Sequence, residues 1–133
     1  MSQNNELKAT TVRGVRGAIT VDKNNPSSIK NATEELLTKM LEVNQINPDD
    51  IAAVFFTTTK DIFEEFPAVA AREMGWKMVP LLCSHEMEVP NGLKKCIRIL
   101  ILWNSEKPQH KIKHSYLKKA VNLRKSENQF DAT

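Results

Sequence analysis

Residues 81–98 read LLCSHEMEVPNGLKKCIR, and the rest of the chain is organised around this stretch. The pattern predicts a strand, a turn and a second strand, because Asn91 and Gly92 tolerate the positive φ that a tight turn needs. Both predicted strands carry groups that can take part in binding or catalysis: the thiol of Cys83, the carboxylate of Glu86 and the guanidinium of Arg98. The stretch therefore predicts a hairpin that carries functional groups.

Arg98 lies in a run, residues 96–103, that is otherwise apolar on both faces of the predicted strand. Such a run is either buried on both sides or faces a subunit interface. An arginine there needs an anionic partner, because an unpaired buried charge costs several kcal/mol. Two kinds of partner are open: a protein carboxylate, for which Glu86 is the obvious candidate, or a bound anion.

The composition is that of an ordinary globular protein. The chain has 133 residues, of which 41% are hydrophobic and 26% charged, so we expect one folded domain. We place a disordered leader at residues 1–10, the domain at residues 11–124 and a mobile tail at residues 125–133. The net charge of +3 is too small to indicate a nucleic-acid partner, although it would suit a small anionic ligand.

The two cysteines and three histidines do not predict a metal site. Cys83 and Cys96 lie in apolar strands without metal-ligand spacing, so we expect buried thiols in a reducing compartment. His110 and His114 are four residues apart on a predicted helix, but no third ligand is in view. The polar first residues do not resemble a signal peptide, and no apolar run is long enough to span a membrane. We therefore expect a cytoplasmic protein.

The periodicity of the chain predicts an α+β fold. We expect strands at residues 11–21 and 51–59 and a short strand at residues 120–123. We expect one helix that starts from the turn at residues 22–28 and ends near Asn44, a second at residues 67–74, the hairpin, and a third helix from Pro108 through Leu117. This order implies a mixed β-sheet with helices packed on one face. The other face would remain uncovered, which indicates that the protein oligomerises.

The remaining polar groups indicate a site for a small anion. The sequence has no Gly-rich phosphate loop, no HExxH or GxSxG motif and no Cys-His-Asp spacing. Gly14 and Gly17 lie close to Arg16, and glycines in a strand often mark a place where a ligand or another backbone approaches closely. The alternative, which the spacing alone favours slightly, is that Arg16 is a solvated charge at the edge of the sheet. Arginines combined with one carboxylate, Glu86, are suited to holding a small polyanion.

Several motifs resemble those of the monofunctional chorismate mutases of the Bacillus type. The resemblance covers about residues 12–124 and rests on the motifs together: Arg13-Gly14-Val15-Arg16-Gly17-Ala18, Phe66-Pro67-Ala68, Ala71-Arg72-Glu73, Gly75-Trp76, Val79-Pro80, Cys83 with Glu86-Met87, Leu93-Lys94-Lys95-Cys96-Ile97-Arg98, His114 with Tyr116-Leu117, and Leu123-Arg124.

The resemblance implies an isomerase that converts chorismate to prephenate on the route to phenylalanine and tyrosine. It also implies a homotrimer, a pseudo-α/β-barrel with active sites at the subunit interfaces, and no cofactor or metal. This [3,3] rearrangement moves no proton and needs no nucleophile. The enzyme must hold a compact conformer of its substrate and stabilise the negative charge that develops on the ether oxygen.

The same resemblance assigns roles to residues of this chain. Arg98 would stabilise the ether oxygen, Arg16 would bind a substrate carboxylate, and Glu86 would hold the ring hydroxyl and orient Arg98. The substrate-binding residues would further include Cys83 beside the ring hydroxyl, Tyr116 at the side-chain carboxylate, Phe66 and Leu123 as apolar walls, Arg72 at the entrance, Leu82 in the wall and Arg124 at the start of a closing tail.

Two departures from the family pattern leave other functions open. Val69 stands three residues after Phe66, where some relatives carry lysine, and Leu82 stands where at least one close relative has threonine. Both favour an alternative, a non-catalytic trimeric module that binds a small dicarboxylate or aromatic metabolite. A third interpretation is a structural oligomer in which Glu86 alone neutralises Arg98.

Overall fold

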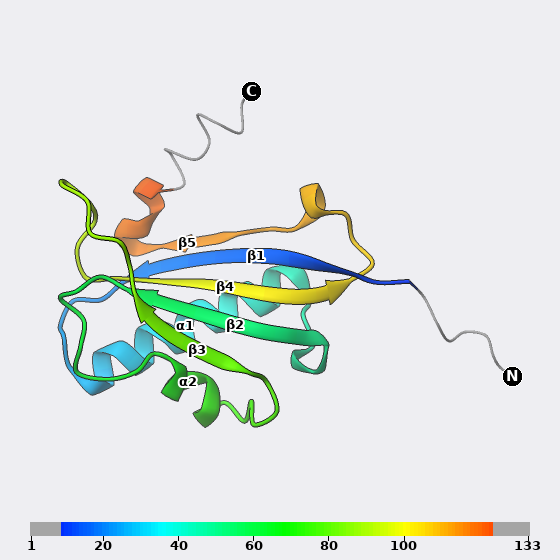
Figure 1. Cartoon of the computed structure of the whole chain (residues 1–133), viewed down its shortest axis with the longest axis horizontal. Coiled ribbons are helices and arrows are strands. Elements are labelled where there is room, and N and C mark those ends of the chain that lie inside the picture. Colours follow the sequence, from blue (N-terminus) through cyan, green and yellow to red (C-terminus); the bar gives the residue numbers. More distant parts are fainter. Residues whose placement is uncertain (1–8, 124–133) are drawn as a thin grey trace, which may run out of the picture.

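A five-stranded sheet forms the frame of the molecule, with helices packed against it (Figure 1). The computed structural model describes residues 9–123, so most of the predicted leader, Arg124 and the predicted tail lie outside the described residues. The elements in chain order are β1 (Thr11–Thr20), α1 (Pro26–Asn44), η2 (Pro48–Asp50), β2 (Ile51–Thr58), α2 (Ala68–Glu73), β3 (Leu81–His85), β4 (Cys96–Ser105), η3 (Gln109–Lys111), β5 (Ser115–Leu117) and η4 (Lys118–Ala120).

The sheet is mixed, as predicted. Its strand order is β3-β2-β4-β1-β5, which places β4 in the centre and β3 and β5 at the two edges. β4 runs antiparallel to both β1 and β2, whereas β3 is parallel to β2 and β5 is parallel to β1. The long central strand β4 thus pairs on either side with β1 and β2, the other two long strands.

Helix α1 begins where the sequence supplies a cap. The Asn25 side chain accepts a hydrogen bond from the Ser28 backbone N–H at 2.8 Å, and Pro26 occupies the first helical turn. Leu36, Leu37 and Met40 form its buried stripe. Between residues 9 and 123 no helix is long and apolar enough to cross a membrane.

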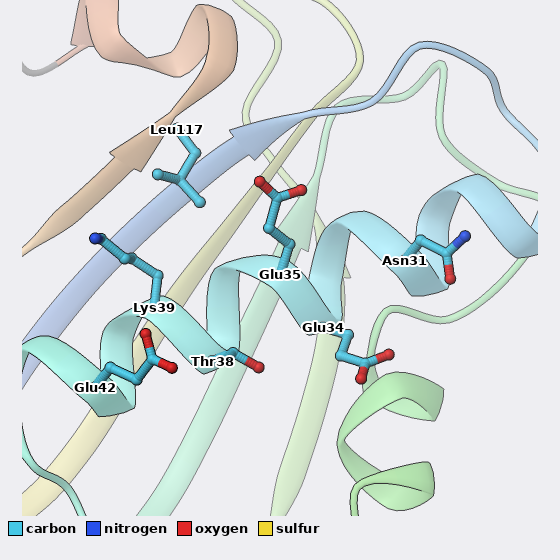
Figure 2. A pocket seen from close by; sticks show the side chains of 7 residues that line it. All are labelled: Asn31, Glu34, Glu35, Thr38, Lys39, Glu42 and Leu117. Atoms are coloured by element: carbon cyan, nitrogen blue, oxygen red, sulfur yellow. The ribbon is translucent and has the colours of Figure 1, made fainter.

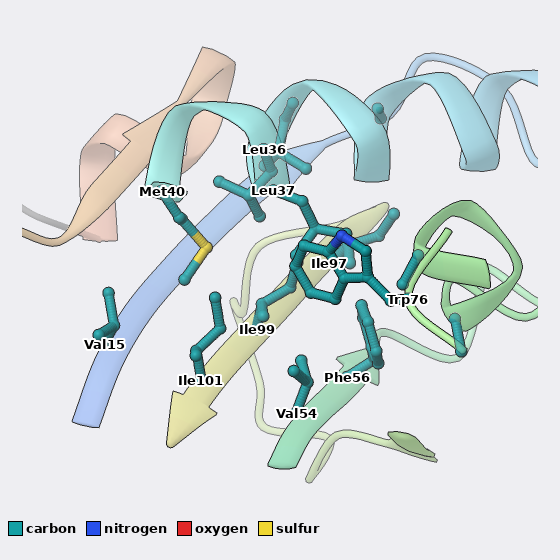
Figure 3. Packing of buried hydrophobic residues seen from close by; sticks show 14 of the residues in the cluster. Val15, Leu36, Leu37, Met40, Val54, Phe56, Trp76, Ile97, Ile99 and Ile101 are labelled. Carbon is teal, nitrogen blue, oxygen red and sulfur yellow. The ribbon is translucent and has the colours of Figure 1, made fainter. Parts of the chain in front are cut away.

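The hydrophobic core lies between the sheet and the two helices (Figure 3). The sheet contributes alternate residues of its long strands, among them Val15, Phe56 and Ile101, because side chains on a strand point to opposite faces in turn. Ala68 and Ala71 of α2 join the same core, and their small side chains let this short helix pack closely. The helices therefore cover one face of the sheet, as the sequence predicts.

The opposite face, which we call the open face, is covered by neither α1 nor α2. Of the described elements only η4 packs there, where Ala120 contacts Ala18 and Cys96 at one end of the face. In β4 the side chains of Ile97, Ile99 and Ile101 are buried against the helices, but Arg98 and Leu100 on the open face are exposed. Within the described residues, Arg98 and Leu100 of the run are therefore not covered, although Cys96 is buried. Burial of this side at a subunit interface stays a prediction.

The predicted hairpin of residues 81–98 is wrong. Its two arms are β3 and β4, but β2 lies between them and pairs with both. The turn itself exists, since Asn91 has a φ of 65° and the Gly92 N–H donates to the Val89 carbonyl at 3.2 Å. The connection at residues 86–95 is long enough to pass over β2, so the chain forms a parallel β2–β3 pair instead of a hairpin.

The predicted helix from Pro108 through Leu117 and the strand at residues 120–123 are also wrong. Only the short η3 is helical before β5, and η4 follows directly. Tertiary hydrogen bonds hold this segment extended: the Asn44 side chain donates to the Lys113 carbonyl at 2.8 Å and accepts from its N–H at 2.9 Å. The Gln109 side chain pairs in the same way with the backbone of Gly14. These contacts with α1 and β1 override the local helix signal.

Gly17 provides a test of the packing between β1 and α1. A Cβ at this position would collide with the Met40 sulfur and come within 3.1 Å of Leu36 Cδ1. We expect Gly17→Ala to lower the free energy of unfolding by about 1–3 kcal/mol, because the core has no room to expand. At Gly14 a Cβ would meet only Leu100, at an ordinary 3.6 Å. Denaturant titration should therefore leave Gly14→Ala close to the parent, and equal stability of the two variants would contradict this view of the core.

Candidate active site

A groove of about 280 Å³ lies on the open face of the sheet. We call it the arginine groove, because two arginines from neighbouring strands line it. Four of the predicted site residues meet here: Arg16 from β1, Arg98 from β4, Tyr116 from β5 and Glu86 from the segment after β3. The other lining residues are Gly17, Ala18, Phe55, Thr57, Ile99 and Leu100.

The register of the strands explains why these side chains converge. Arg98 is paired with Ala18 on one side and with Thr57 on the other, and paired residues point to the same face. Ala18 is in turn paired with Tyr116 of β5. Ala18 therefore lies between the arginine and the tyrosine and belongs to the lining of the groove.

Arg16 lies on an inner strand. β1 runs between β4 and β5, but β5 pairs only with Gly17, Ala18 and Ile19, and Arg16 is exposed, so the alternative of a solvated charge stays open. Its backbone N–H donates to His114 Nδ1 at 2.9 Å, which attaches the segment before β5 to β1. This bond fixes the approach of the strand that carries Tyr116.

Arg98 and Glu86 face one another without a close contact. The guanidinium Nη1 lies 3.9 Å from Glu86 Oε2, which is too long for a hydrogen bond, and 51% of the Arg98 side chain is exposed. An exposed pair of this kind contributes little to stability. The Glu86 carboxylate therefore lies near the guanidinium but does not form a buried ion pair with it.

Two other predicted residues lie on the far side of β3. A second hollow, of about 320 Å³, is lined by Phe66 and Cys83, and we call it the phenylalanine hollow. Cys83 is paired with Phe56 and points to the helix side of the sheet, whereas Arg98 points to the open face. Phe66 is 66% exposed. One chain therefore does not bring Cys83 and Phe66 to Arg98.

The remaining predicted residues that the structure describes belong to the lining of neither hollow. Leu123 lines a wide recess of about 1000 Å³ beside the 86–95 segment, together with Glu86 and Arg98. Arg72 is exposed in the last turn of α2, and Leu82 is 59% exposed on β3. Arg124 lies outside the described residues.

Both thiols are held in the protonated form. Burial raises the pKa of the Cys96 thiol from 9.0 to about 11, against the opposing charge of Arg98. Burial also raises the pKa of Cys83, and a backbone hydrogen bond and the charge of Arg72 oppose the shift. A thiol that remains neutral at physiological pH is a poor nucleophile, so neither residue is suited to covalent catalysis.

Two groove residues are not found by sequence reasoning, Phe55 and Thr57. Both belong to β2, and their side chains face the groove because β2 lies between β3 and β4. The alternation of side chains along β2 does indicate that Phe55 and Thr57 share one face of the sheet, opposite to the face of Val54 and Phe56. It does not indicate which strands are neighbours, so the wrong hairpin hides their place beside Arg98.

A further hollow lies along the outer surface of α1 (Figure 2). Its lining carries three carboxylates on the helix, Glu34, Glu35 and Glu42, against the single ammonium of Lys39, and Leu117 from β5 is an apolar contact. Carboxylates at this density repel an anionic ligand. The arginine groove is therefore the hollow that suits an anion.

The chain is similar to known chorismate mutases along most of its length. Residues 12–127 match the family described as chorismate mutase type I. The chain is 52% identical to chorismate mutase AroH of Thermus thermophilus over 114 residues, which are 85% of this chain and 93% of that protein. It is 43% identical to chorismate mutase AroH of Bacillus subtilis (strain 168) over 114 residues, 85% of this chain and 90% of that protein.

A solved structure gives the same result. A chorismate mutase from Clostridium thermocellum superposes with a TM-score of 0.81 at 44% identity, covering 83% of this chain and 98% of that chain. These matches confirm the family that the sequence motifs indicate. The chain belongs to the chorismate mutase type I family.

Proposed function

We propose that this protein converts chorismate to prephenate, and that the arginine groove is where the reaction takes place. The observation that carries the proposal is the convergence of Arg16, Arg98 and Glu86 on the open face of one sheet. Two cations and one oriented carboxylate suit a substrate with two carboxylates and a ring hydroxyl. The membership of the chain in the type I family supports the same activity.

In this proposal the groove acts by orientation and charge. Binding of the compact substrate conformer brings the two carbon atoms that will bond into contact, which lowers the entropic part of the barrier. As the C–O bond breaks, electron density builds on the ether oxygen. A guanidinium fixed beside that oxygen stabilises the transition state more than the ground state, and we assign this role to Arg98.

The other groove residues bind the ends of the substrate. We assign Arg16 and Tyr116 to the substrate carboxylates, since a guanidinium and a phenol both donate to carboxylate oxygens. Glu86 accepts a hydrogen bond from the ring hydroxyl and orients Arg98. Leu123, which borders the recess next to Arg98, contributes an apolar wall.

We further propose a homotrimer in which each site is shared by two protomers. The open face exposes apolar side chains, with Phe55 and Leu100 each 37% exposed and Leu82 59% exposed at the sheet edge. The phenylalanine hollow of one protomer would cover the arginine groove of the next. This arrangement would place Phe66, Cys83 and Arg72 of one protomer opposite Arg98 of another, and Arg98 would lose its exposure to solvent.

A cytoplasmic location is part of the same proposal. Cys83 and Cys96 are both free thiols, which agrees with a reducing compartment. The chemistry assigned to the groove uses no metal, cofactor or nucleic acid.

The alternative is a trimeric module that binds the same kind of metabolite without converting it. Val69 on α2 and Leu82 on β3 are apolar where polar contacts with a substrate would be expected, and they favour this alternative. Mixing the protein with chorismate and following its ultraviolet absorbance separates the two. An enzyme-dependent fall in absorbance with formation of prephenate supports the mutase, and unchanged absorbance despite binding supports the module.

The pH dependence of turnover gives a second check on the mechanism. We expect kcat to be nearly flat between about pH 6 and 9, because no proton is transferred in the rearrangement. Burial raises the pKa of Cys96 to about 11, above this range, and also raises the pKa of Cys83. Initial rates across this range test the prediction. A steep bell-shaped profile would assign acid–base work to Glu86 or to a histidine and would contradict a purely electrostatic mechanism.

A further inference from the structure

The Glu86 carboxylate is held by two donors that are not arginines. The hydroxyl of Thr57 donates to Glu86 Oε2 at 3.0 Å, and the backbone N–H of Met87 donates to Oε1 at 3.2 Å. Arg98 Nη1 is more distant from the same Oε2, at 3.9 Å. Thr57 therefore makes the shorter contact with the oxygen that faces the arginine.

The position of Thr57 follows from the sheet. Thr57 is paired with Arg98 of β4, so its hydroxyl lies next to the arginine on the open face. Glu86 stands just after β3, and its backbone N–H donates to the Thr58 carbonyl at 2.8 Å. A glutamate side chain has several rotatable bonds, and only a fixed partner selects one orientation among them. Thr57 belongs to an inner strand and can provide such a fixed partner.

We propose that Thr57 is a positioning residue, whose hydroxyl holds the Glu86 carboxylate beside Arg98 in the orientation that catalysis needs. This inference rests on the function proposed above. With its Oε2 bound to Thr57, the carboxylate stays close enough to orient the guanidinium but does not form a direct bidentate pair with it. The guanidinium donors then remain directed to the substrate.

The consequence of losing the hydroxyl is specific. Without the donor from Thr57, Glu86 can turn toward Arg98 and pair with it directly, or turn away toward solvent. In the first case the guanidinium is occupied when the ether oxygen becomes negative, and in the second it loses its orientation. Both outcomes reduce kcat through Glu86 and Arg98, without any contact between Thr57 and the reacting atoms.

The experiment compares Thr57→Val with Thr57→Ser, each in the parent and in a Glu86→Ala background. Valine keeps the shape and the strand preference of threonine but removes the hydroxyl, whereas serine keeps the hydroxyl. Thr33→Val is the control, because it removes a buried hydroxyl that donates to the Ile29 carbonyl within α1, outside the groove. Chorismate turnover and thermal unfolding are measured for every variant.

We expect Thr57→Val to lower kcat roughly tenfold to a hundredfold, the range for a lost hydrogen bond to a charged group, with a smaller change in KM. Thr57→Ser should restore most of the rate, and Thr33→Val should match the parent. In the Glu86→Ala background Thr57→Val should have no further effect, because the group that it positions is absent.

Three results would overturn the inference: full activity of Thr57→Val, equal losses in Thr57→Val and Thr57→Ser, or the same fold-loss from Thr57→Val with and without Glu86. The last result would mean that Thr57 acts independently of the carboxylate. These outcomes are distinct from failure of the proposed function, in which the parent protein itself does not convert chorismate.

Discussion

Replacing Arg98 with alanine is expected to lower kcat for chorismate by about 100- to 1000-fold, the effect of removing one fixed donor to a developing negative charge. Arg98 stands on the central strand of the sheet, between Ala18 and Thr57, so its position depends on the most extensively paired part of the fold. Its side chain is half exposed and is not required to fill the core. We therefore expect the alanine variant to fold, and thermal unfolding should show a small change.

The conservative variant and a matched control sharpen this prediction. Arg98→Lys should also be slow, because a single ammonium does not reproduce the planar, multiply donating guanidinium. Arg13→Ala removes an arginine from β1 whose Nε donates to the Lys107 carbonyl, away from the groove, and should retain parental turnover. Near-parental kcat in Arg98→Ala would remove Arg98 from the mechanism.

Local patterns predict the helices and strands between residues 11 and 75. The predicted strand at residues 11–21 and the predicted helix ending at Asn44 match β1 and α1 almost to the residue. The reason is that a cap, an alternation of period two and an apolar helical stripe are local signals that tertiary contacts here reinforce. The helix that follows Pro67 is found for the same reason, with Gly75, at a φ of 94°, just after it.

The pairing of strands cannot be predicted in this way. The turn at Asn91 and Gly92 is real, yet β3 and β4 are separated by β2, because local turn chemistry does not determine which strand fills the space between two arms. Similarly, Pro108 is a good start for a helix, but Gln109 of the short η3 is bound to the backbone of Gly14 and Lys113 is bound to Asn44, so the helix does not continue. Both errors arise from contacts between residues far apart in the sequence.

In the candidate site, too, some residues are predicted from the sequence and others depend on how the strands pair. Residue types alone predict a basic site for a small anion, and the motifs that resemble the family single out Arg16, Glu86, Arg98 and Tyr116, which the groove brings together. Thr57 has no motif and becomes visible only through its register with Arg98. Cys83 and Phe66 lie apart from Arg98 in one chain, so their predicted roles depend on a second protomer.

A subunit-mixing experiment tests whether the site is shared. It uses two variants, Arg98→Ala in the arginine groove and Phe66→Asp in the phenylalanine hollow. Phe66 is 66% exposed in the single chain, so aspartate should be tolerated in the fold. In the shared site it would place a carboxylate against a dicarboxylate substrate. Each variant alone is expected to have little activity and to form oligomers of the parental size.

The mixing experiment assumes that each site is formed by the arginine groove of one protomer and the phenylalanine hollow of its neighbour. In a mixed oligomer, the groove of a Phe66→Asp protomer can meet the hollow of an Arg98→Ala protomer, and that site is intact. With equal amounts and random exchange, about a quarter of the sites regain both halves, because each half is intact with a probability of one half. A mixture of Arg98→Ala with a chain that carries both substitutions provides the control, since none of its grooves retains Arg98.

The most direct measurement is therefore the rate of chorismate conversion by the mixed oligomers, with native mass spectrometry to verify that both variants occur in one assembly. Recovery to about a quarter of the parental rate, and none in the control mixture, is the result expected from a guanidinium that acts in a site built by two protomers. Mixed oligomers that remain as inactive as the separate variants would contradict that account.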